Sequence, residues 1–129
     1  MGHMYEMAAA SGCDVSLDMG ALPLLPGAQE LSRRGIRSSL YDGNAQRASC
    51  IANAQDGRAT AHPAYPLLFD PQTCGGLLFA VPATEASAMV VALRGGGYPD
   101  AARIGTVTSD ERGKRHDGRM REPAVTIIV

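Results

Sequence analysis

Residues 65–81 read Tyr-Pro-Leu-Leu-Phe-Asp-Pro-Gln-Thr-Cys-Gly-Gly-Leu-Leu-Phe-Ala-Val, two apolar runs on either side of a polar segment. The two runs, residues 65–69 and 77–81, are apolar at successive positions. Such runs are typical of short strands that are buried on both faces. The stretch therefore predicts two buried strands joined by a tight loop, residues 70–76.

The residue types in this loop allow two interpretations. Pro71 fixes its own φ and favours an extended Asp70, while Gly75 and Gly76 can adopt a positive φ and allow a sharp reversal. The Thr73 hydroxyl and successive backbone N–H groups could also bind an anion, although the Asp70 carboxylate opposes one. On the residues alone, a structural turn is favoured over a ligand-contacting loop.

Upstream of this stretch, the clearest patterns lie at the start of the chain. Apolar residues recur at helical spacing over residues 4–11, with Met4 and Met7 at core positions, and Gly12 can end the helix. Residues 14–18 then alternate between polar and apolar, which predicts a strand with one solvated face.

Two further helices are predicted between this strand and the central stretch. The first covers residues 28–34, with Leu31 facing inward and Gly35 at its end. The second begins at Asn44 as N-cap and carries Ile51 on its apolar face.

The C-terminal part of the chain predicts one helix and two strands. Thr84 is expected to cap a helix whose apolar positions are Ala86, Met89, Val90 and Leu93. Strands over residues 103–108 and 125–129 are separated by a polar loop, residues 109–122. Because helices and strands alternate but some strands are adjacent, we predict an α+β fold, a mixed sheet with helices packed on its faces.

The composition limits the classes of protein. The chain has 129 residues, 45% of them hydrophobic, which predicts a single folded domain over residues 1–129. A net charge of −1 provides no overall basic field for nucleic acid or an anionic membrane. The sequence contains neither a secretory signal nor an apolar run of membrane-spanning length, so we expect a cytoplasmic protein.

Cysteines and histidines are few and widely spaced: Cys13, Cys50, Cys74, His3, His62 and His116. An odd number of cysteines excludes a closed disulfide framework, and this spacing provides no zinc quartet. Cys13 and Cys50 are expected in the core or on a helix face. A basic run around His116 is interpreted as a solvated loop, because it has no aromatic residue for stacking on bases: Arg112, Lys114, Arg115, Arg119 and Arg121.

The central stretch resembles a known family. Residues 67–78, LLFDPQTCGGLL, are similar to the Asp-Pro-Gln-Thr-Ser-Gly-Gly-Leu-Leu signature of selenophosphate synthetase (selenide, water dikinase). Shorter stretches agree with the same family in the same order: Gly2-His3 with Glu6-Met7-Ala8, residues 22–28, residues 35–40, Gly97-Tyr98 and residues 102–107.

The resemblance implies a place within a larger enzyme. That enzyme converts ATP, selenide and water into selenophosphate, AMP and phosphate, and has two domains of the aminoimidazole ribonucleotide synthetase type. This chain matches only the C-terminal domain, which is partly ferredoxin-like. Mg²⁺ and ATP are then bound mainly by the absent N-terminal domain, so the fragment alone is expected to be inactive and to hold no cofactor.

For this chain, the resemblance implies a supporting role. The expected partners are its own N-terminal domain and a second copy in a homodimer, with selenide and ATP as the parent's substrates. No catalytic residue and no metal ligand is expected here. The candidate cleft and anion-binding residues are Asp70, Gln72, Thr73, Cys74, Gly75 and Gly76.

Cys74 stands where the family pattern usually has Ser, and it is interpreted as a small residue in a turn. The local sequence supplies no base or cation that would activate its thiol.

Three alternatives remain. The first is the C-terminal domain of another enzyme of the same superfamily, which the Asp-Pro-Gln-Thr-x-Gly-Gly loop argues against. The second is a stand-alone ferredoxin-like module that regulates or binds a small ligand. The third is a purely structural dimerisation domain.

Overall fold

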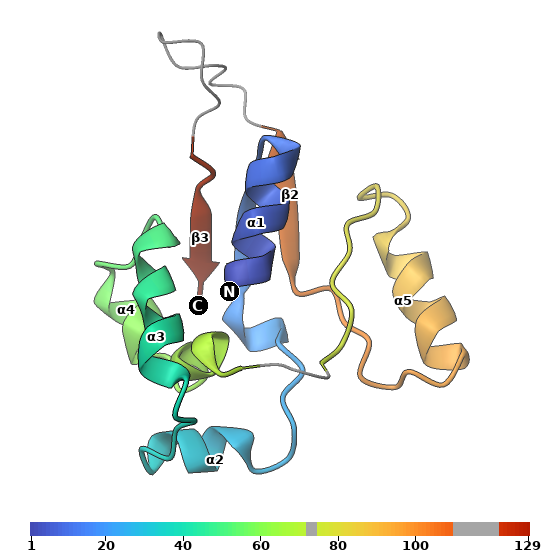
Figure 1. The fold of residues 1–129 in the computed structure, drawn as a ribbon. Helices are drawn as coiled ribbons and strands as arrows, with labels where there is room; N and C mark the ends of the chain where they lie inside the picture. Colours follow the sequence, from blue (N-terminus) through green and yellow to red (C-terminus); the bar gives the residue numbers. More distant parts are fainter. Residues whose placement is uncertain (72–74, 110–121) are drawn as a thin grey trace, which may run out of the picture.

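A three-stranded mixed sheet lies at the centre of the computed structural model, which describes residues 1–71, 75–109 and 122–129. The strands are β1 (Cys13–Asp18), β2 (Gly105–Ser109) and β3 (Val125–Ile128), in the order β2-β1-β3. Strand β1 pairs antiparallel with β2 and parallel with β3. The sheet and its helices confirm the predicted α+β class (Figure 1).

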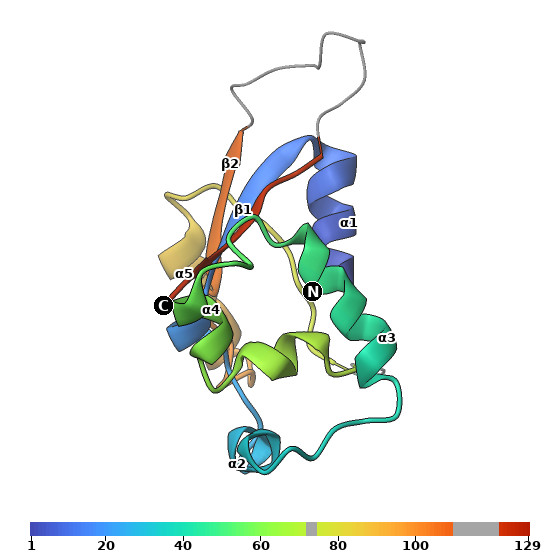
Figure 2. The same cartoon turned by 90° about the vertical axis from the view of Figure 1, so that its left-hand side faces the viewer.

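The helical elements of the described residues are mostly short: α1 (Gly2–Ser11), η1 (Met19–Ala21), α2 (Ala28–Arg33), α3 (Tyr41–Ala45), η2 (Gln46–Cys50), α4 (Gly57–Ala61), η3 (Tyr65–Phe69) and α5 (Ala86–Gly95). Helices α1 and α5 lie on opposite sides of the sheet (Figure 2). No helix among the described residues is long and apolar enough to cross a membrane.

The core forms between α1 and one face of the sheet. Alternate residues of the two neighbouring strands, Val15 and Leu17 on β1 with Val125 and Ile127 on β3, are buried and lie side by side in the register. The remaining buried hydrophobic residues come from the helices and connections: Met4, Ala8, Met19, Ile51, Ala59, Ala64 and Phe69. Period-2 alternation in β1 thus produces one buried and one solvated face, as predicted.

The structure confirms the helices and strands that were predicted from a regular spacing of apolar residues or from alternation along the chain. Helix α1 ends at Gly12, whose left-handed backbone (φ 61°) lets its N–H bond back to the last carbonyls. Strands β2 and β3 fall within two residues of their expected bounds. On α5, the predicted apolar stripe is the half-buried side of the helix: Ala86, Met89, Val90 and Leu93.

Both apolar runs of the central stretch were wrongly predicted as strands. Residues 65–69 form the 3-10 helix η3, because Pro66 suits the first turn of a helix and the tight coil turns Phe69 into the core. Residues 77–81 belong to no strand, and Leu77 is 93% exposed rather than buried on two faces. Apolar content alone does not distinguish these conformations.

Five predictions about single residues are also wrong. Leu31 is 44% exposed and Met7 43% exposed, because α2 and α1 each turn that side toward solvent. Asn44 lies inside α3 instead of capping it, and Ile51 forms a parallel β-bridge with Val125. Helix α5 begins after Glu85, so Thr84 is not its N-cap.

The predicted loop over residues 109–122, with its basic run, lies almost wholly outside the described residues. Gln72, Thr73 and Cys74 also lie outside them.

Candidate functional site

The 3-10 helix η3 holds the start of the sequence motif against the core. Phe69, its last residue, is 3% exposed and meets the rings of Tyr41 and Tyr65 edge-on, with centroids 6.4 and 5.4 Å away. Edge-to-face pairs add to the free energy gained by burying aromatic surface. The apolar half of the motif is thus the fixed part.

Two hydrogen bonds hold the backbone of η3 from outside. The amine of Met1 donates to the carbonyl oxygen of Leu68 (3.0 Å), and the Asn44 side-chain amide donates to that of Phe69 (3.0 Å). Burial lowers the pKa of the Met1 amine. Elements far apart in the sequence therefore fix the chain immediately before the polar loop.

The predicted site residues are only partly described. Asp70 is half-buried and follows the fixed Phe69, while Gly75 and Gly76 are exposed. Gly76 does not have a positive φ, and a Cβ there would meet nothing within 4 Å. The expected sharp reversal is therefore not made at Gly76. Gln72, Thr73 and Cys74 lie outside the described residues, so the contacts expected of this loop stay a prediction.

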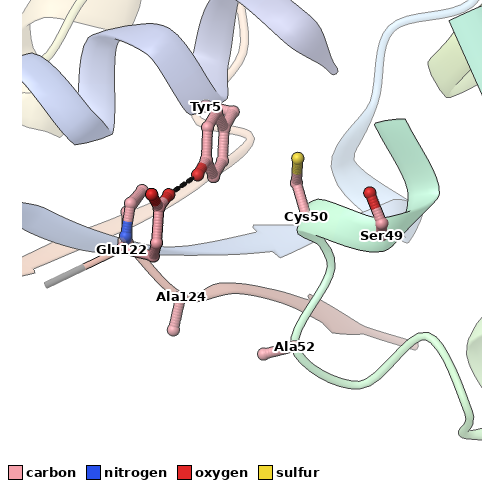
Figure 3. A pocket seen from close by; sticks show the side chains of 7 residues that line it. Tyr5, Ser49, Cys50, Ala52, Glu122 and Ala124 are labelled. Carbon is pink, nitrogen blue, oxygen red and sulfur yellow. Dashed lines mark hydrogen bonds between the residues drawn. The ribbon is translucent and has the colours of Figure 1, made fainter. Parts of the chain in front are cut away.

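A second feature, which the sequence did not reveal, is a hollow of about 480 Å³ between α1, the end of η2 and the residues leading into β3 (Figure 3). The Tyr5 hydroxyl donates a hydrogen bond to the Glu122 carboxylate on its exposed rim. The full lining is Tyr5, Ser49, Cys50, Ala52, Glu122, Pro123 and Ala124. Tyr5 and Glu122 are 117 residues apart, and no local pattern connects them.

The thiols of the described residues carry no signature of nucleophilic chemistry. Cys13 and Cys50 are free and half-buried, which agrees with their predicted packing role. The Cys13 thiol donates to the carbonyl oxygen of Ala8 at 3.7 Å. Cys50 lines the same hollow as Glu122, and the residues lining the hollow contribute no cation that would favour a thiolate.

Two carboxylates of the described residues are bound to the backbone at the start of short helices. Asp18 accepts a hydrogen bond from the Gly20 N–H, and Asp56 accepts one from the Arg58 N–H, both at 2.9 Å. Each carboxylate therefore caps its own helix. No group of three or more His, Cys, Asp or Glu side chains in the described part of the chain could hold a metal ion. We derive no metal-dependent step for this chain.

Comparison with known proteins identifies the family. Residues 1–118 match the family described as AIR synthase related protein, C-terminal domain. The chain belongs to this family. The match includes α1, the sheet strands β1 and β2, and the whole of the motif around Phe69 and Asp70.

Curated relatives of this AIR synthase related C-terminal domain are selenide, water dikinases. The protein of Pelobacter propionicus is 37% identical over 111 residues, which cover 85% of this chain and 31% of the relative. That of Nitratidesulfovibrio vulgaris (strain Miyazaki F) is 38% identical over 98 residues, 76% of this chain and 27% of the relative. That of Rhizobium meliloti is 34% identical over 109 residues, which cover 84% of this chain and 31% of the relative.

The predicted resemblance to selenophosphate synthetase is confirmed by these comparisons. The chain spans less than a third of the length of these relatives.

Proposed function

We propose that this chain is the C-terminal domain of a selenide, water dikinase, a phosphotransferase that makes selenophosphate, AMP and phosphate from ATP, selenide and water. The observation that carries the proposal is the family match over residues 1–118 together with 37% identity to a selenide, water dikinase over 111 residues. The motif at residues 67–78 lies within both matched lengths.

In this proposal the chain supplies surface and backbone, and the reactive groups belong to the rest of the enzyme. The fixed η3 presents Asp70 and the loop that follows it toward the active-site cleft. Thr73, Gly75 and Gly76 are the proposed contacts to a phosphate oxygen, through a hydroxyl and backbone N–H groups. The firm hold on Phe69 supports this role, because a contact loop needs a rigid base.

ATP and Mg²⁺ are proposed to bind mainly to the N-terminal domain of the parent enzyme. Phosphoryl transfer depends on cations and metal ions placed around the phosphates. Asp18 and Asp56 are occupied as helix caps, which supports assigning the metal ligands to another part of the enzyme.

The proposed partners are that N-terminal domain and a second copy of the chain. Five large apolar side chains of residues 77–98 are exposed, and contact with another folded unit would remove them from water: Leu77, Leu78, Phe79, Val91 and Tyr98. Exposed apolar groups of this kind mark protein–protein contacts.

A chimera tests the proposal. The segment of the Pelobacter propionicus enzyme that matches this chain is replaced by residues 1–129, and selenide-dependent AMP formation is measured beside the unaltered enzyme. We expect the chimera to form AMP only when selenide is present. Cooperative thermal unfolding would establish that the chimera is folded, and a folded chimera without this activity would contradict the proposal.

A further inference from the structure

The hollow between α1, the end of η2 and the segment leading into β3 has no role in the proposed enzymatic function. Its volume of about 480 Å³ falls within the range of small-molecule sites, about 300–1,000 Å³. Tyr5 comes from α1, Cys50 from the end of η2, and Glu122 from the segment before β3 (Figure 3). Side chains from three separate parts of the chain therefore surround one space.

The hydroxyl groups that line the hollow have already donated their hydrogen atoms. The Tyr5 hydroxyl donates to the Glu122 carboxylate, and the Ser49 hydroxyl donates to the carbonyl oxygen of Gln46 (2.9 Å). Because a hydroxyl has one hydrogen and two lone pairs, Tyr5 and Ser49 can only accept hydrogen bonds from a ligand. Cys50 adds a free thiol, which is a weak donor and a weak acceptor.

Backbone donors on two sides of the hollow are also occupied. The Ala52 N–H donates to the carbonyl oxygen of Val125, and the Ala124 N–H donates to the Asp14 carboxylate, each at 2.7 Å. Pro123 has no N–H. Ala52, Pro123 and Ala124 therefore contribute apolar surface to the hollow, and their backbone offers a ligand no free donor.

The charge of the hollow points in the same direction. Among the residues that line it, Glu122 is the one carboxylate, and none is Lys, Arg or His. One oxygen of Glu122 accepts the hydrogen bond from Tyr5, and no hydrogen bond from a described residue reaches the other oxygen. An anion would meet a negative charge and no strong side-chain donor. An ammonium group has three donors and no acceptor, so it matches both the charge and the acceptors.

We propose that the hollow is a binding site for a small primary amine in its ammonium form. The ammonium group donates to the free oxygen of Glu122 and to the hydroxyl oxygen of Tyr5, and the alkyl part lies against Ala52, Pro123 and Ala124. A bound amine thereby connects α1 with the segment before β3. This inference does not depend on the proposed enzymatic function.

Titration of the 129-residue chain with n-butylammonium, followed through the backbone amide signals by NMR, tests the site. n-Butanol and n-butyrate are the neutral and anionic controls of similar size, at constant ionic strength and about pH 7, where the amine is protonated. We expect saturable shifts of the Cys50, Ala52 and Ala124 amides with n-butylammonium, at least about tenfold weaker binding of n-butanol, and no saturable shift with n-butyrate. Shifts that do not saturate, or that either control produces at similar concentrations, would overturn the proposal.

Two variants with the same change in charge assign the binding to Glu122. Glu122→Gln keeps the shape of the side chain and removes its charge, and we expect n-butylammonium to bind at least about tenfold more weakly. Glu6→Gln on α1 is the matched control, because Glu6 is exposed and does not line the hollow. It should leave the affinity unchanged. Equal affinities of the two variants for n-butylammonium would contradict the proposal, because the amine would then respond only to the net charge of the chain.

Discussion

A side chain at Gly105 would collide with the carbonyl oxygen of Ser16 on the neighbouring strand β1. The contact lies at the end of the β1–β2 register, where Gly105 is opposite Leu17. The next backbone hydrogen bond, from the Asp18 N–H to the carbonyl oxygen of Ile104 (2.9 Å), holds the two strands together there. Glycine is therefore required here for close approach of two strands, and not for an unusual φ.

We expect Gly105→Ala to lower the free energy of unfolding by about 2 kcal/mol, the cost of overpacking at a fixed site. Gly43→Ala is the matched control, because a Cβ at Gly43 in α3 meets nothing within 4 Å. Alanine should stabilise that helix by about 0.5–1 kcal/mol. Urea unfolding of both variants measures the difference. Equal effects at the two positions would contradict the packing account.

Tyr65 gives the chain a specific response to alkaline pH. Burial raises the pKa of its phenol, and the neighbouring Tyr41 raises it further. The folded state therefore holds this proton more tightly than the unfolded state, in which the pKa is about 10. The contribution of Tyr65 to stability is complete below about pH 10 and is lost as the pH rises from there through the raised folded value.

In Tyr65→Phe the ring that contacts Phe69 remains and the ionisable group is removed. We expect the difference in Tm between this variant and the original chain to be constant below about pH 10 and to shift in favour of the variant above it. Thermal unfolding across this range provides the measurement. A difference that stays constant through the alkaline range would show that Tyr65 titrates alike in both states.

At the scale of elements, sequence prediction succeeded where a period was clear. Helix α1 and strand β1 each repeat over enough residues to define a face, and Gly12 marks the boundary between them. Residues 65–69 and 77–81 have no period, so composition favoured strands for both. The conformation of residues 65–69 depends instead on tertiary contacts of Phe69, which no local pattern encodes.

Strand β3 depends on a side chain that the sequence did not single out. Asn53 makes two hydrogen bonds with the backbone of Ile127, and the adjacent Ala52 N–H donates to Val125 (2.7 Å). A turn region thus substitutes for a neighbouring strand. No local sequence pattern could predict this pairing, because Asn53 and Ile127 are 74 residues apart.

We expect Asn53→Ala to cost about 2 kcal/mol of unfolding free energy, because it leaves a part-buried N–H and C=O of Ile127 without these partners. Ser49→Ala removes an exposed hydroxyl bonded only to the carbonyl of Gln46 and should stay within about 0.5 kcal/mol. Chemical denaturation compares the two variants. A loss below about 0.5 kcal/mol for Asn53→Ala would mean that β3 does not depend on this cap.

At the scale of the whole molecule, the order of motifs along the chain predicted the family, and the match over residues 1–118 confirms it. The candidate site could be predicted only as a stretch of sequence. The structure adds why its first half is rigid: Phe69 is held by Tyr41, Tyr65 and Asn44. The hollow beside Tyr5 and Glu122 could not be predicted, because three separate segments form it.

The central claim is that this chain completes an active site whose reactive groups lie on another part of the enzyme. Asp18 and Asp56 cap their own helices, and the residues that line the hollow with Cys50 include no cation that would activate its thiol. A chain of this kind can fold and position a loop without itself transferring phosphate.

The most direct test is to incubate the purified 129-residue chain with ATP, Mg²⁺ and selenide and to follow the nucleotides by phosphorus NMR. The account predicts a cooperatively folded protein that forms no AMP above the rate without protein. Selenide-dependent formation of AMP and phosphate by the chain alone would contradict it.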